Sequence, residues 1–153
     1  RKGIMIGGNM VSWYGGFDSF ILASSVTDNI ISPKMGRAIE GEEQLGIKQL
    51  SYLEWDHWIN ALSNCKIGVH MMRTHAAGTF ALNCSYLGIP CIGYKGLDTQ
   101  ELCHPNLTVE VGDLVKAKNL LKELENNKAF YSNCSSDAKK NYLEYYHESK
   151  FKI

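Results

Sequence analysis

The chain has 153 residues, 44% of them hydrophobic, and its 16 basic side chains balance 16 acidic ones. This length suits one domain with a full hydrophobic core. A formal net charge of zero provides no basic field, so we expect no nucleic acid as a partner. The longest apolar runs are too short to span a bilayer, so we also expect no transmembrane segment.

Cysteine usage points to a reducing compartment. The chain has five cysteines, an odd number, without any C-x-x-C spacing: Cys65, Cys84, Cys91, Cys103 and Cys134. This pattern predicts small buried hydrophobes rather than a disulfide framework or a zinc site, and hence a cytoplasmic location. The sequence opens on Arg1 with neither an initiator Met nor a signal peptide, which suggests a piece of a longer protein.

The first half of the chain alternates short apolar runs with longer amphipathic ones. Strands are predicted at residues 3–8, 29–32 and 47–52, and helices at 17–26, 34–45 and 53–65. The last of these helices carries a stripe of apolar residues at helical spacing: Trp55, Trp58, Ile59 and Leu62.

The second half continues the alternation. Strands are predicted at residues 66–72, 89–94 and 107–111, and helices at 78–88, 114–127 and 135–147. Gly88 is expected to stop the helix before it, and Asp113 to cap the helix after it. His70 lies inside a predicted strand and is expected to be buried and hydrogen-bonded. Glu101 and His104, in the loop predicted before the last strand, are expected at the surface, with a position facing the cleft as the alternative.

Strands separated by helix-length segments predict βαβ crossovers. The expected fold is α/β: one Rossmann-like domain over residues 1–153, with a doubly wound parallel sheet of about six strands and helices on both faces. Ligands of such folds bind outside the carboxyl ends of the strands, where the strand order reverses. Two loops, residues 8–16 and 73–79, are therefore predicted to border the binding site.

The second loop is rich in groups suited to an anion. The guanidinium of Arg73 can bond two oxygens of a phosphate, and Gly78 permits the backbone to approach a ligand closely. Thr79 lies at the start of a predicted helix, and a helix start favours anions. His75 lies between Arg73 and Gly78. The alternative is that Gly78 forms only a turn and Thr79 only a helix cap, and the residues by themselves leave both interpretations open.

The segment "INALSNCKIGVHMMRTHAAGTFALNCSYLGIPCIGY" resembles the C-terminal, donor-binding domain of GT-B glycosyltransferases of group 1. The order of its parts is similar: a helix, a strand, a glycine loop with a helix, and a strand opened by proline. The resemblance extends over roughly residues 3–127. It implies a domain that binds a nucleotide-diphosphate sugar as donor substrate, without a metal or a further cofactor, while a missing N-terminal domain carries the acceptor site.

The resemblance also implies individual roles. Two glutamates typical of the family fall on His75, which would lie near the donor sugar as the catalytic residue, and on Asn83, which would contact the ribose. Gly8 and Asn9, in the first loop, join Arg73, Gly78 and Thr79 as expected donor-binding residues. The basic pair of the family aligns near Asn9 and Tyr14, neither of which is charged. A degenerate, non-catalytic module that binds a nucleotide or a partner protein is therefore the alternative.

Overall fold

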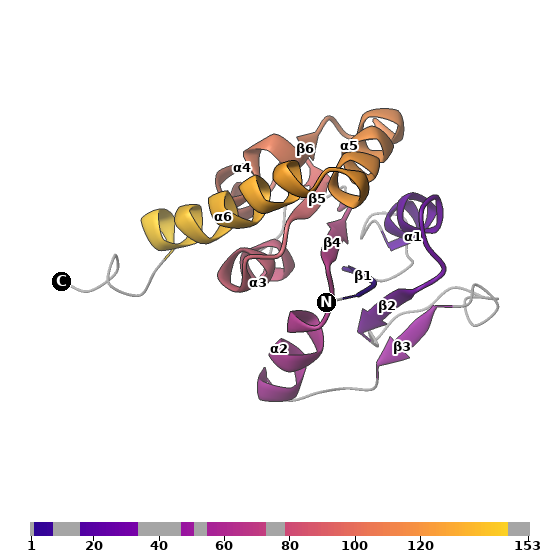
Figure 1. Cartoon of the computed structure of the whole chain (residues 1–153), viewed down its shortest axis with the longest axis horizontal. Helices are drawn as coiled ribbons and strands as arrows, with labels where there is room; N and C mark the ends of the chain where they lie inside the picture. The colour runs from indigo at the N-terminus through magenta and orange to yellow at the C-terminus, as the bar shows by residue number, and fades with distance from the viewer. Residues whose placement is uncertain (1, 8–15, 34–46, 51–54, 73–78, 147–153) are drawn as a thin grey trace.

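Six parallel strands form a single sheet with the order β3-β2-β1-β4-β5-β6 (Figure 1). The computed structural model describes residues 2–7, 16–33, 47–50, 55–72 and 79–146. The strands are β1 (Ile4–Ile6), β2 (Ile30–Pro33), β3 (Lys48–Leu50), β4 (Ile67–His70), β5 (Cys91–Tyr94) and β6 (Thr108–Val109). The order runs outward in both directions from β1 and β4, which confirms the predicted doubly wound Rossmann-like sheet.

Helices connect the strands and cover the sheet. They are α1 (Gly16–Ser24), α2 (Trp55–Ser63), α3 (Thr79–Leu87), α4 (Asp98–Cys103), α5 (Leu114–Asn126) and α6 (Lys128–Tyr145), with a 3-10 turn, η3 (Pro105–Leu107), before β6. The helix predicted at residues 34–45 and the side chains of Trp55 and Trp58 lie outside the described residues. In the part of the chain that is described, no helix is both long and apolar enough to cross a membrane.

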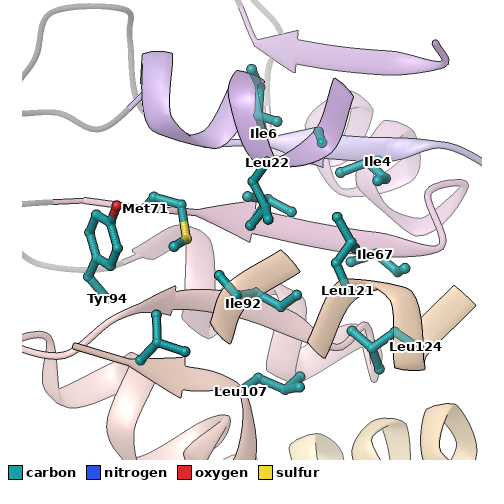
Figure 2. Packing of buried hydrophobic residues seen from close by; sticks show 14 of the residues in the cluster. Ile4, Ile6, Leu22, Ile67, Met71, Ile92, Tyr94, Leu107, Leu121 and Leu124 are labelled. Carbon is teal, nitrogen blue, oxygen red and sulfur yellow. The ribbon is translucent and has the colours of Figure 1, made fainter. Parts of the chain in front are cut away.

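One face of the sheet packs against α1 and α5. Leu22 of α1 and Leu121 and Leu124 of α5 lie over alternate residues of the central strands, such as Ile67 and Ile92 (Figure 2). Each of these five side chains is almost completely removed from water. Burying one aliphatic side chain of this size stabilises a fold by about 1.5–3 kcal/mol, so this layer is the main apolar core.

The opposite face packs against α2 and α3. Met5 of β1 and Cys91 of β5 lie there with Leu62 of α2 and with Phe80 and Cys84 of α3. The long helix α6 then runs across α3, α4 and α5 (Figure 1). All five cysteines are free and buried, which confirms that they act as small core residues.

Two predicted helix boundaries are confirmed in detail. Gly88 has φ +71° after α3, and its N–H donates to Ser85 O at 3.1 Å while Ile89 N–H donates to Cys84 O at 2.8 Å. These two bonds make a Schellman motif, which requires the left-handed backbone that glycine adopts easily. The Asp113 carboxylate accepts from Lys116 N at 3.0 Å and caps α5.

Two predictions about the second half are wrong. The last helix starts at Lys128 rather than at residue 135, because the Asn127 side chain caps it by accepting from Phe130 N at 3.0 Å. The helix α4 was not predicted, because six residues are too few to show a helical period. It starts directly after the turn that follows β5 and places Gln100 and His104 against the sheet.

Candidate functional site

The strand order reverses between β1 and β4, and both strands are central in the sheet. Gly7 directly follows β1, and its N–H donates to Val69 O at 2.9 Å, which prolongs the ladder. A Cβ atom on Gly7 would lie 2.8 Å from Phe80 Cγ and 2.9 Å from His70 Cδ2. Only glycine therefore fits at the point where β1, β4 and the start of α3 meet.

Of the seven predicted site residues, only Thr79 and Asn83 belong to the described part of the chain. Thr79 is the exposed first residue of α3, and Asn83 is half-buried one turn later. Residues four apart on a helix lie on the same side, so the structure brings these two together at the start of α3. The other five lie outside the described residues: Gly8, Asn9, Arg73, His75 and Gly78.

The start of α3 lies beside the carboxyl end of β4. Phe80, in the first turn, packs on the imidazole of His70 with 5.2 Å between ring centroids and an interplanar angle of 60°. The first turn of a helix directs its backbone N–H groups outward along the axis and carries the positive end of the helix dipole. This position in a doubly wound sheet suits an anionic group of a ligand.

Two side chains in the first turn of α1 form hydrogen bonds to the carboxyl ends of β4 and β5. Met71 N–H donates to Ser19 Oγ at 2.9 Å, and the Tyr94 hydroxyl donates to Asp18 Oδ2 at 2.9 Å. Sequence reasoning missed both pairs, because their partners lie 52 and 76 positions apart and no local pattern links them. They fix where α1 begins beside the switch point.

His104 is buried, so the expected surface position is wrong for this residue. Its side chain lies under α4, where Nε2 bonds Ala81 O at 3.0 Å and Nδ1 accepts from Cys91 N–H at 3.4 Å. Only a neutral ring with its proton on Nε2 makes both bonds. Burial lowers the pKa of His104 to about 4, although the bond to Ala81 acts in the opposite direction. His104 thereby joins α4, the first turn of α3 and the start of β5.

Glu101 also has a structural partner. Its side chain is half-buried, and Oε2 accepts from Gly96 N–H at 3.2 Å in the turn between β5 and α4. The carboxylate thus stabilises the turn that carries the chain from the carboxyl end of β5 into α4.

His70 is buried as predicted, with 5% of its surface exposed. Burial lowers the pKa of His70 to about 4, so the ring is neutral near pH 7. Its Nδ1 has no hydrogen-bond partner among the described residues, so the predicted hydrogen bond is not found at this atom. Within the same residues, no group of three or more His, Cys, Asp or Glu side chains is arranged to hold a metal ion.

No model of a known protein family matches the sequence, and no curated protein matches it. Solved structures do match. The catalytic domain of cholesterol-α-glucosyltransferase from Helicobacter pylori is 14% identical, with a TM-score of 0.73 over 95% of this chain and 99% of that one. The C-terminal domain of a group 1 glycosyl transferase, LpcC from Francisella tularensis, is 16% identical, with a TM-score of 0.72 over 95% and 86%.

A third match is a longer protein with a bound ligand. Anabaena HepE in complex with UDP-glucose is 14% identical, with a TM-score of 0.71 over 94% of this chain. This chain spans 44% of the length of HepE. The chain therefore has the fold of the C-terminal domain of GT-B, group 1 glycosyltransferases, which is the fold that the sequence resemblance implied.

Proposed function

We propose that the chain is the donor-binding domain of a glycosyltransferase that transfers a hexose from a nucleotide-diphosphate sugar to an acceptor. The observation that carries this proposal is the position of the α3 N-terminus beside the carboxyl ends of β1 and β4, in the fold that HepE uses in its UDP-glucose complex. A helix start and the positive end of its dipole at this position favour the diphosphate of a donor. The buried free thiols support a reducing compartment such as the cytoplasm as the place of action.

In this proposal the diphosphate binds to the first amides of α3, assisted by Arg73, Gly78 and Thr79. Asn83, one turn into α3, bonds the ribose hydroxyls, because its side-chain amide can both donate and accept. His75 contacts the donor sugar. Such a site works by positioning the donor and by stabilising charge on the leaving diphosphate.

A second domain completes the proposed enzyme. Because this chain spans 44% of HepE, the acceptor site is assigned to a separate N-terminal domain, and the 153 residues by themselves are expected to transfer no sugar. The test compares the isolated chain with the full-length protein, using UDP-glucose and a panel of acceptors. Transfer by the isolated chain would contradict the two-domain assignment.

A non-catalytic module that binds a nucleotide or a partner protein is the second candidate. Four positions favour it: His75 and Asn83 replace the two glutamates expected from the resemblance, and Asn9 and Tyr14 carry no positive charge. A nucleotide-binding module would still bind nucleotide and a partner-binding one would not, but in both cases the full-length protein would transfer no sugar.

Ligand binding is tested by thermal unfolding with uridine, guanosine and adenosine diphosphates and with the matching nucleosides. We expect at least one diphosphate to raise the melting temperature well above the effect of its nucleoside, because the phosphates make the main contacts. Arg73→Gln should reduce this shift, whereas Lys118→Gln, at an exposed position of α5, is the matched control. Equal shifts with diphosphate and nucleoside, or none at millimolar ligand, would refute the diphosphate site.

A further inference from the structure

Two buried polar atoms lack a hydrogen-bond partner in the described part of the chain: His70 Nδ1 and Gln100 Oε1. Their residues expose only 5% and 1% of their surfaces. A buried polar atom without a partner costs about 1–3 kcal/mol, so each of these two atoms calls for a physical explanation, such as a bound water or ligand atom.

The sheet brings these two residues side by side. His70 at the end of β4 pairs in register with Gly93 of β5, so the side-chain positions of the two lie on the same face. Gly93 has no side chain, and the carboxamide of Gln100 occupies that space, with Oε1 only 2.5 Å from where a Gly93 Cβ atom would lie. The Gln100 amide therefore lies over β5 at the position that neighbours His70 of β4.

The contacts of the two residues indicate on which side each unpartnered atom lies. His70 Cδ2 faces Gly7 of β1, and Nδ1 belongs to the opposite edge of the ring, towards β5. Gln100 Nε2 already donates to Cys91 O at 2.9 Å and to Thr108 Oγ1 at 3.3 Å, which fixes Oε1 as the free end of the amide. Oε1 can only accept, whereas a neutral imidazole nitrogen can donate or accept.

We propose that His70 Nδ1 and Gln100 Oε1 together bind one hydrogen-bearing oxygen atom, supplied by an ordered water or by a hydroxyl group of a ligand. This oxygen donates to Gln100 Oε1 and accepts from His70 Nδ1–H. It links the carboxyl end of β4 to α4 at the edge of the sheet where ligands of this fold bind. The site is independent of the proposed function, because a water would occupy it without any nucleotide.

Crystal structures of the chain without ligand and with UDP-glucose test the site directly. We expect an oxygen within about 3.2 Å of both atoms. A water in both structures identifies water as the source, and a ligand hydroxyl in its place in the complex identifies the ligand. The absence of such an oxygen from both structures would overturn the proposal. Whether UDP-glucose binds at all is measured separately by thermal unfolding with and without this ligand. Failure of the proposed function can therefore be distinguished from failure of this site.

Thermal unfolding of ligand-free variants provides a second test. The Asn amide nitrogen can take the place of His70 Nδ1, so His70→Asn should retain more stability than His70→Leu. His70→Leu and Gln100→Met should each lower the melting temperature by about 3–8 °C, while the double variant should lose clearly less than the sum. Gln100→Met also removes the Gln100 bonds to Cys91 and Thr108. This loss is the same in the single and the double variant, so it cancels when the melting temperatures are compared. Additive losses, with Asn no better than Leu, would contradict a shared oxygen.

Discussion

The Tyr94 hydroxyl at the end of β5 donates a 2.9 Å hydrogen bond to the carboxylate of Asp18 in the first turn of α1. Tyr94 is 1% exposed and packs in the core beside Met71 (Figure 2), so the packing of its ring holds the hydroxyl in position. This bond joins two segments that border the switch point of the sheet. It therefore couples the stability of the fold to the shape of the candidate site.

Replacing Tyr94 by Phe removes only the hydroxyl and keeps the aromatic packing. We expect Tyr94→Phe to lower the free energy of unfolding by about 1–2 kcal/mol, because a hydrogen bond to a charged acceptor is lost at a partly buried position. Urea unfolding measures the change. Asp18→Ala, which removes the acceptor, is the matched partner variant, and the double variant should lose less than the sum of the two single losses. Strict additivity would show that the bond contributes nothing.

The stability of the protein should fall as pH falls from about 6.5 to 4. Burial lowers the pKa of both His70 and His104 from 6.5 to about 4, so between these values the unfolded chain binds protons that the folded chain does not. Above pH 6.5 both states are neutral and the contribution is constant. Each histidine should account for a loss of up to about 3 kcal/mol by pH 4. Urea unfolding across this pH range measures the slope.

The variant His104→Gln isolates the contribution of His104 to the pH dependence of stability. Its amide can still donate to Ala81 O but does not titrate, so the slope of stability between pH 6.5 and 4 should be shallower than in the parent chain. Carboxylates titrate equally in both proteins and cancel in the comparison. An unchanged slope would mean that His104 has an ordinary pKa in the folded state.

Gly88 and Gly112 offer a matched pair for backbone strain. Both have positive φ, +71° and +88°, but a Cβ atom on Gly88 would lie 2.7 Å from Lys139 Cε, whereas nothing lies within 4 Å at Gly112. We expect Gly112→Ala to cost about 1 kcal/mol for the backbone alone, and Gly88→Ala to cost more. Combining Gly88→Ala with Lys139→Ala should remove most of the difference. Equal costs for the two glycine variants would show that the lysine moves aside freely.

Variants at Asn83 distinguish a role in ligand binding from a role in core packing. We expect Asn83→Ala to weaken binding of a nucleoside diphosphate by about 1–2 kcal/mol, the effect of losing one hydrogen-bonded partner, without lowering the melting temperature of the free protein. Asn83→Glu should bind at least as well as the parent chain, because a carboxylate also accepts from a ribose hydroxyl. A variant that loses stability but keeps its affinity would place Asn83 in the packing of α3 instead.

Features that depend on neighbours in the chain were predictable. The stop at Gly88 and the cap at Asp113 each use contacts within a few residues, so the residue type reveals the structure. The alternation of apolar runs predicted the parallel sheet, because a strand buried on both faces must be apolar throughout. The start of α6 was missed, because the polar residues around Asn127 resemble a loop and become helical where Phe130 and Tyr131 pack against the core.

The class of fold and the start and end signals of the helices can be derived from the amino-acid sequence, because they follow from backbone geometry and hydrophobic period. Which distant polar groups come into contact depends on how the chain packs in three dimensions. The tertiary structure buried His104 between Ala81 and Cys91, joined Tyr94 to Asp18, and placed Gln100 over Gly93 beside His70. Contacts between such distant residues depend on strand order and register. The energy of each hydrogen bond is gained only after the chain has closed the long loop between its two partners.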